Sequence, residues 1–253
     1  MNIKEIINYI KSAPIEELTL ENISLKFHYN PTYFSRKFKE TTGISYRKYL
    51  ELLKIQRGKK LLLNKEDKIV QVSLDSGFKF SNNFSKSFKS QTGILPKNYF
   101  SISKQCYKLI KLLFNLNFDY YIKDSRIMTN NLLFVDLIFP EKNIDCINFV
   151  GLFKEPVPNT IPIIGLATRR KTSLILDKIP NGEYYLLACE IRKDQSFNNV
   201  FMMEDNFRAK YQKKIIFEGD NNYYISLDMR EAIPEDPPIT INLLKLLHDI
   251  IKR

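Results

Sequence analysis

Apolar side chains near the start of the chain recur at helical spacing, first in one short segment and then in a second. The first segment predicts a helix over residues 19–27. Asn30 predicts the start of the next helix, because its side chain can accept a backbone N–H and Pro31 has no N–H to satisfy. That helix would bury Phe34 and Phe38, which lie one turn apart. The pattern therefore predicts two short helices separated by a tight turn.

The same pattern returns fifty residues further along the chain. Eight of the sixteen residues at 34–49 are identical at 84–99, where unrelated sequence would give about one. Both copies contain Thr-Gly-Ile after the two phenylalanines. A glycine in that position, here Gly43 and Gly93, is typical of a helix C-terminus. The chain therefore contains an internal duplication, and its second copy predicts a helix over residues 81–91 with two buried phenylalanines.

A longer helix is predicted between the two copies, from Ser45 to Leu63. It would span roughly 28 Å, close to the ~34 Å between successive major-groove segments on one face of B-DNA. A single chain could thus present two short helices to one duplex, and we expect an asymmetric target. Gly58, in the middle of the long helix, lowers its helix propensity by about 1 kcal/mol relative to alanine.

The outward faces of the two short helices carry polar and basic side chains. In the first copy these are Thr32, Ser35, Arg36 and Lys39, and in the second they are Asn82, Ser85, Lys86 and Lys89. An arginine or lysine beside asparagine and serine on a short helix can reach guanine and adenine edges in a major groove. One such helix is equally typical of a solvated surface, but two basic copies favour DNA binding.

The positive charge is concentrated in the duplicated part of the chain. The 253 residues have a formal net charge of +11 at pH 7. Residues 1–103 contain 18 Lys and Arg against nine Asp and Glu, whereas residues 104–253 contain 21 against 19. A net charge of +9 in one part and +2 in the other favours the docking of a polyanion on the first.

On these residues, the first part of the chain resembles the DNA-binding domain of the AraC/XylS family of bacterial transcription regulators. The resemblance covers about residues 3–100. It rests on the Tyr33–Lys39 run, Thr42-Gly43-Ile44, Gly77-Phe78, the Phe84–Gly93 segment, Pro96 and Tyr99. It implies base contacts from Thr32, Ser35 and Arg36 on the first recognition helix, and from Asn82, Asn83 and Lys86 on the second.

Further expectations follow from the resemblance. Arg36 and Lys86 would read bases, and phosphate contacts would come from Lys39, Lys48, Lys89 and Lys97. His28 stands where the family has a glycine in the first turn, so we expect it to serve as a turn residue. Double-stranded DNA is the expected partner, and the resemblance also implies activation through contact with RNA polymerase.

Beyond residue 128 the pattern changes to short β-rich runs separated by turn signals. Strands are predicted at 131–139, 146–152, 161–168, 173–178, 183–191, 212–217 and 222–230. About seven antiparallel strands suit a two-sheet sandwich, and residues 179–188 are similar to a turn and strand of transthyretin-like and carboxypeptidase-regulatory domains. An amphipathic helix is predicted from Thr240 to Arg253. Residues 234–238 are expected to be an extended connector, and residues 169–171 a solvated basic loop.

The predicted fold class is an all-α double helix-turn-helix domain followed by a mostly antiparallel β-sandwich with a C-terminal helix. We expect a DNA-binding domain at 1–103, an interdomain linker or helix at 104–128 and a β-rich domain at 129–253. The last would sense a small-molecule effector or join two copies into a homodimer. An alternative is a GyrI-like pocket for cationic small molecules, with Glu190 or Glu183 as its acidic residue.

Catalytic and metal chemistry are disfavoured. The cysteines at 106, 146 and 189 have no metal-ligand spacing, and His28 and His248 lie at opposite ends of the chain. None of the eight glycines belongs to a phosphate-binding motif. We therefore expect no cofactor and no metal, and an enzyme tethered by a DNA-binding domain is the remote alternative. The lack of an apolar run near ~18 residues, and acidic residues instead of a signal peptide, favour a cytoplasmic protein without a membrane span.

Overall fold

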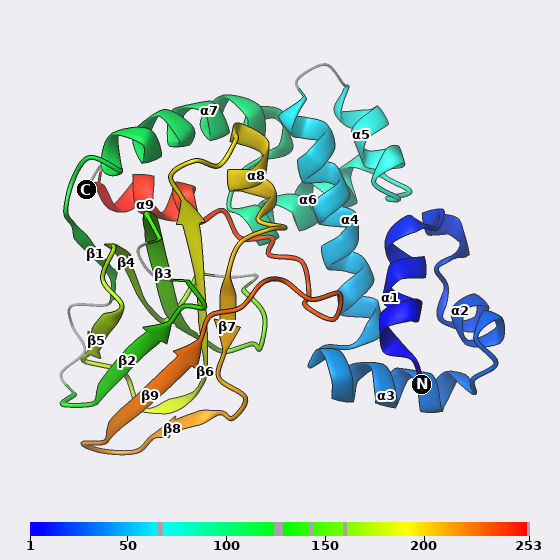
Figure 1. Ribbon diagram of the computed structural model, residues 1–253. Helices are drawn as coiled ribbons and strands as arrows, with labels where there is room; N and C mark the ends of the chain where they lie inside the picture. The colour runs from blue at the N-terminus through cyan, green and yellow to red at the C-terminus, as the bar shows by residue number, and fades with distance from the viewer. Residues whose placement is uncertain (65–67, 124–128, 142–143, 159–160, 252–253) are drawn as a thin grey trace. The chain divides into compact units, whose positions relative to one another are not determined.

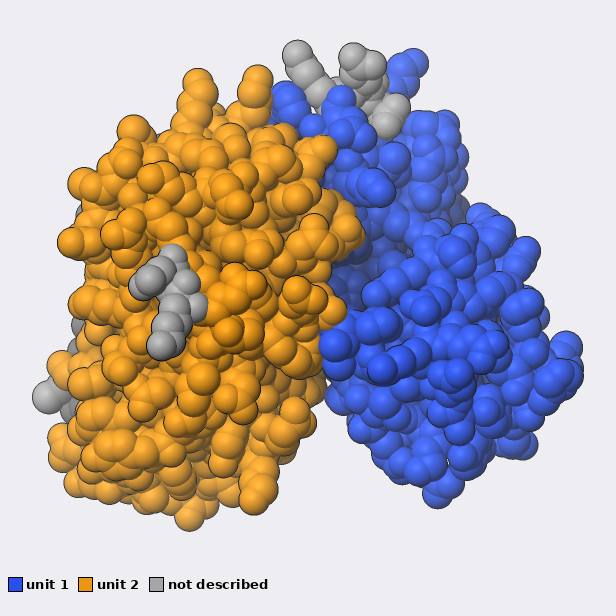
Figure 2. Space-filling view, viewed as in Figure 1, with its two compact units in different colours: residues 1–100, 233–240 blue, residues 101–232, 241–253 orange. Residues whose placement is uncertain are grey.

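The computed structural model describes residues 1–64, 68–123, 129–141, 144–158 and 161–251. The chain divides into two compact units (Figure 2). Unit 1 consists of residues 1–100 and 233–240, and unit 2 of residues 101–232 and 241–253. The domain boundaries expected at residues 103 and 128 stay predictions.

Unit 1 is built from short helices around a longer one (Figure 1). They are α1 (Ile3–Ser12), the 3-10 helix η1 (Ile15–Glu17), α2 (Leu20–Lys26), α3 (Pro31–Thr42), α4 (Tyr46–Leu63), α5 (Ile69–Asp75), α6 (Ser81–Thr92) and the start of α7 (Pro96–Leu113). The predicted helix pairs are confirmed as α2–α3 and α5–α6, and the predicted long helix as α4. The sequence pattern did not predict α1, which buries Ile6, Ile7 and Ile10.

Local chemistry explains where α3 begins and ends. The Asn30 side chain accepts the backbone N–H of Thr32 at 2.9 Å, and Pro31 is the first residue of α3. The helix ends at Gly43, whose φ of 79° is a left-handed conformation that glycine adopts without steric cost. His28 also has a positive φ, 57°, so the turn role expected for it is confirmed.

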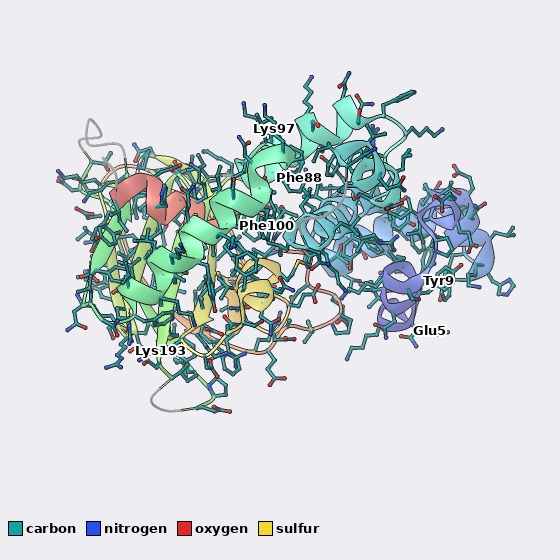
Figure 3. The ribbon with its side chains drawn as sticks, turned by 90° about the horizontal axis from the view of Figure 1, so that it is seen from above. Glu5, Tyr9, Phe88, Lys97, Phe100 and Lys193 are labelled. Atoms are coloured by element: carbon teal, nitrogen blue, oxygen red, sulfur yellow. The ribbon has the colours of Figure 1, made fainter. Side chains whose placement is uncertain are left out.

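The two copies hold their second helices, α3 and α6, with the same aromatic contact. The rings of Phe38 on α3 and Tyr49 on α4 meet edge to face with centroids 5.3 Å apart. Phe88 on α6 and Tyr99 on α7 repeat this arrangement at 5.0 Å, and Figure 3 shows Phe88 beside the first part of α7, which also carries Lys97. All four aromatic side chains are fully buried. The duplication therefore extends from sequence to tertiary packing.

Gly58 allows α4 and α6 to approach closely. A Cβ atom at this position would lie 2.7 Å from Cε2 of Phe84 and 3.1 Å from Oγ of Ser76, the first of which is shorter than real Cβ contacts. The residue that weakens the helix propensity of α4 thus provides the space that Phe84 occupies.

Unit 2 is a β-sandwich with helices at its sides (Figure 1). Its strands are β1 (Asp119–Ile122), β2 (Leu132–Ile138), β3 (Cys146–Phe153), β4 (Ile164–Arg169), β5 (Ser173–Asp177), β6 (Gly182–Arg192), β7 (Arg208–Lys210), β8 (Ile215–Phe217) and β9 (Asn222–Asp228). One sheet has the order β1-β4-β3-β6-β7, with β8 also paired to β6, and the other has the order β5-β2-β9. The apolar core contains inward residues of both sheets, such as Leu133 and Val135 of β2 and Val150 and Leu152 of β3.

The sandwich agrees with the predicted fold class, with several differences in detail. The pairing of β2 with β9 is parallel, while the other described strand pairs are antiparallel. No hairpin constrains β2 and β9, because the chain between them builds most of the other sheet. β1, β7 and the helix α8 (Phe197–Met202) were not predicted, and the strand predicted at 212–217 is only the three-residue β8.

The C-terminal helix is α9 (Leu243–Ile251), which begins later than the predicted Thr240. Thr240 instead belongs to unit 1. Within the described parts of the chain, every helix is too short or too polar to cross a membrane.

Candidate nucleic-acid interface

The recognition helices α3 and α6 bury their phenylalanines and turn their polar faces outward. Seven predicted contact residues are exposed on these helices: Thr32, Arg36, Lys39, Asn82, Asn83, Lys86 and Lys89. Ser35 is half-buried on α3. Lys97 is exposed on α7, whereas Lys48 on α4 is half-buried. The predicted side chains therefore come from four helices of one unit.

Arg36 is the most prominent cation of the first recognition helix, with 66% of its side chain exposed. Its guanidinium carbon lies 5.8 Å from the centre of the Tyr33 ring, and its Nε lies 4.0 Å from the Glu40 carboxylate. That carboxylate is hydrogen-bonded by Lys37 at 2.8 Å, and this bond lowers the pKa of Glu40. Exposed ion pairs are weak and exchange readily, so Arg36 keeps donors free for another acceptor.

A groove of about 770 Å³ runs along α4 and brings the two copies together. Ser35 lines it from α3, and Asn83 and Ser87 line it from α6. Arg47 and Lys54 of α4 add positive charge to its wall. Predicted base-contacting residues of both recognition helices thus border one continuous depression.

Glu51 holds the second recognition helix in place beside this groove. Its Oε1 accepts hydrogen bonds from Ser87 Oγ at 2.8 Å and from Gln91 Nε2 at 3.3 Å. Its Oε2 accepts one from Lys48 Nζ at 3.2 Å. Burial acts to raise the pKa of Glu51, but these hydrogen bonds and the Lys48 charge outweigh it and lower that pKa below its ordinary value. Glu51 is therefore an anion that ties α6 to α4.

Sequence reasoning missed Glu51, although a signal was present. It is the one acidic residue in the basic helix Tyr46–Leu63. Its partner Lys48 was predicted to contact phosphate, and this ion pair sets Lys48 apart from the exposed Lys39 and Lys89, which were also predicted to contact phosphate. Lys54 was missed as well. It lies 5.6 Å from the centre of the Phe78 ring, and burial lowers its pKa.

The basic run in unit 2 is a solvated loop at Arg170 and Lys171, as expected, but not at Arg169, which ends β4. Arg169 is buried, donates to the Phe114 carbonyl at 2.9 Å and pairs with Asp145. Arg170 pairs with the same carboxylate at 3.2 Å, and Lys171 pairs with Asp119. The fold places these cations beside acidic residues far away in sequence, so all three form ion pairs within unit 2.

The two candidate acids of unit 2 have opposite environments. The Glu183 side chain is 54% exposed and forms an ion pair with Lys214 at 2.7 Å. Glu190 has a fully buried side chain, and its Oε1 accepts the backbone N–H of Phe207 at 2.9 Å. Among the described residues its Oε2 has no hydrogen-bond partner. Burial raises the pKa of Glu190 to about 7, although the Phe207 hydrogen bond and the charge of Arg192 act in the opposite direction.

Unit 2 also has a cavity of about 610 Å³. One of its lining residues, Asn148 of β3, is paired directly opposite Glu190 of β6. Phe139 and Arg170 also line it. A cavity lined by an apolar side chain, an amide and a charged group can accommodate a small polar molecule.

Comparison with known proteins gives matches in the helical part of the chain. Residues 23–102 match a family described as a helix-turn-helix domain. The chain is 33% identical over 93 residues to the uncharacterized HTH-type transcriptional regulator YobQ of Bacillus subtilis, which covers 37% of this chain and 39% of that protein. It is 36% identical over 94 residues to the uncharacterized HTH-type transcriptional regulator YtdP of the same organism, covering 37% of this chain and 12% of that protein.

A solved structure, the C-terminal domain of the two-component response regulator yesN from Fusobacterium nucleatum, is 32% identical, with 40% of this chain and 99% of that chain covered and a TM-score of 0.37. The matched part of the chain spans less than half the length of either curated relative.

Proposed function

Residues 23–102 belong to the AraC-type helix-turn-helix family, and from this premise we propose that the chain reads DNA with both of its recognition helices. α3 and α6 would enter successive major-groove segments of one duplex. The observation that carries the proposal is the groove along α4, because Ser35 of α3 and Asn83 of α6 both line it. Because both helices would belong to one chain and differ in sequence, we expect a target with two unlike half-elements.

The roles of the individual side chains follow from their chemistry and exposure. Arg36 and Lys86 would bind guanine edges, and the hydroxyl and amide groups of Thr32, Ser35, Asn82 and Asn83 would bind adenine or phosphate. Lys39, Lys89 and Lys97 are exposed and would neutralise phosphates. Lys48 would reach a phosphate only by breaking its ion pair with Glu51, so we expect it to contribute less to DNA affinity.

Selection from a random duplex library tests this proposal. The full-length protein should enrich a motif with two half-elements about ten base pairs apart. Arg36→Ala should remove base preference from one half-element, and Lys86→Ala from the other. Enrichment of no motif would overturn the proposal, and so would loss of the same half-element in both variants.

For unit 2 we propose ligand sensing or homodimer formation. We assign DNA binding and contact with RNA polymerase to unit 1. We propose, in keeping with this regulatory role, that the protein is cytoplasmic and is not an enzyme. Sedimentation of the full chain at several concentrations distinguishes a dimer from a monomer. A monomer at all concentrations would leave sensing as the role of unit 2.

A cationic small molecule is a second candidate ligand, favoured by the buried carboxylate of Glu190. The Oε2 of this side chain is not hydrogen-bonded to any described residue, and the charged form of a buried acid is stabilised by a bound cation. A panel of aromatic cations should raise the melting temperature of the protein, and Glu190→Gln should abolish the effect. Glu183→Gln is the matched control, because Glu183 is exposed and pairs with Lys214 at 2.7 Å, whereas Glu190 is fully buried with Arg192 3.7 Å away. Equal responses from both variants would refute this site.

A further inference from the structure

The segment Ile233–Thr240 follows β9 and precedes α9, yet it belongs to unit 1 with the DNA-binding helices (Figure 2). We call it the strap. It lies outside residues 23–102, which match the helix-turn-helix family. Its three prolines, at positions 234, 237 and 238, restrict the backbone, so ordering it costs less conformational entropy than ordering an average segment. The sequence predicted an extended connector at residues 234–238 and the start of a helix at Thr240.

The strap caps a buried lysine of α4. Lys59 is 1% exposed, and its Nζ donates to the backbone carbonyl of Ile239 at 2.9 Å. A buried ammonium group needs acceptors, because its loss of hydration is otherwise uncompensated. Ile239 itself is buried. The strap is therefore docked by a charge-assisted hydrogen bond inside the unit.

The next residue of the strap reaches the second recognition helix. Thr240 Oγ1 donates to Gln91 Oε1 on α6 at 3.2 Å, and both side chains are buried. The amide nitrogen of Gln91 donates in turn to Glu51, which also binds Ser87. A carbonyl oxygen that accepts on one side and an NH2 group that donates on the other define a single orientation of this amide. One connected set of hydrogen bonds thus runs from the strap to α6 and α4.

The first copy lacks the equivalent connection at the matching position. Thr41 aligns with Gln91 across the duplication. It is exposed, and its hydroxyl donates to the Lys37 carbonyl within its own helix at 3.0 Å. The described contacts of the strap with a recognition helix therefore concern α6.

We propose that Thr240 is a positioning residue for DNA recognition, and that the strap sets the placement of α6 through Gln91, Glu51 and Ser87. The inference rests on the proposed function, since it concerns the half-element that α6 reads. Removal of the Thr240 hydroxyl leaves the Gln91 oxygen buried without this donor, and α6 can then rotate or shift to regain one. Base recognition by Asn82, Asn83 and Lys86 suffers, whereas α3 keeps its placement.

The test compares the full-length protein with Thr240→Val, Thr240→Ser and Thr41→Val. The affinity of each is measured by fluorescence anisotropy on the selected target and on two duplexes in which one or the other half-element is scrambled. Thr240→Val should lower discrimination against the scrambled α6 half-element about tenfold, the effect of one lost buried hydrogen bond. Discrimination at the α3 half-element should be unchanged, Thr240→Ser should restore the wild-type ratio, and Thr41→Val should behave as wild type.

Three results would overturn the inference: unchanged discrimination in Thr240→Val, equal loss at both half-elements, or no recovery in Thr240→Ser. Equal loss would mean that the strap only stabilises the unit as a whole. These failures leave two-element binding by the wild-type protein intact. If the wild-type protein itself discriminates at neither half-element, the proposed function fails together with the inference.

Discussion

Replacement of Gly58 by alanine sets two opposing effects against each other on α4. Alanine is favoured over glycine in a helix interior by about 1 kcal/mol. The added methyl group, however, would lie 2.7 Å from Cε2 and 3.0 Å from Cζ of Phe84. The Phe84 ring is fully buried, with the rings of Phe78 and Phe88 each 5.3 Å from it, centre to centre. Overpacking of this kind costs about 1–3 kcal/mol, so we expect a net destabilisation of up to roughly 2 kcal/mol.

Urea unfolding followed by circular dichroism at 222 nm measures this balance, because helices dominate that signal and many of them belong to unit 1. Ser90→Ala is the control: Ser90 is exposed on α6, so the substitution improves helix propensity with no buried contact to disturb. The control should unfold at an equal or higher urea concentration than wild type, and Gly58→Ala at a lower one. Stabilisation of Gly58→Ala by about 1 kcal/mol, the value of helix propensity alone, would refute the steric reasoning.

Three further predictions concern charged side chains. Arg36→Ala should cost about 1–3 kcal/mol on the preferred duplex and relax specificity at one or two base pairs; an equal loss on every sequence in a binding assay would identify Arg36 as a phosphate contact. Lys39→Ala should weaken binding to all duplexes and reduce the slope of log affinity against log salt by about one, and an unchanged slope in a salt titration would exclude a phosphate contact. Glu190 retains its proton up to about pH 7 in the folded protein, whereas the ordinary value is 4.5. The folded state therefore binds more protons than the unfolded state in this window, and stability should fall by up to about 3 kcal/mol as the pH rises through it. Glu190→Gln should remove this dependence in urea melts at pH 5 and pH 8, and a profile identical to wild type would show that other groups cause it.

The duplicated helices and their boundaries could be predicted from sequence because their causes are local. The Asn30 cap binds a residue two positions away, and the turn at Gly43 depends on the φ of one residue. Phe34 and Phe38 mark the buried face of α3 by their spacing alone, and the outward face that carries Arg36 follows from it.

Strands β2, β5 and β9 were predictable for the same reason, since alternation along each strand reports its buried face, whereas β1 and β7 were not predicted. The pairing of the strands was not predictable. The parallel contact of β2 with β9 depends on how the intervening chain is arranged, and the pattern of neither strand contains that information. The burial of Arg169 and Glu190 likewise results from which residues the register places around them.

The amino-acid sequence by itself determined that this chain carries two short helices with basic outward faces on a duplicated helical frame, because hydrophobic period, capping and charge act within a few residues. Only the tertiary structure decided that Gly58 makes room for Phe84, that Glu51 anchors α6, and that the strap belongs to the DNA-binding unit. These depend on contacts between distant residues: Thr240 and Gln91 are 149 positions apart. Such a hydrogen bond leaves no periodic trace in the sequence, since only the tertiary fold brings its partners together.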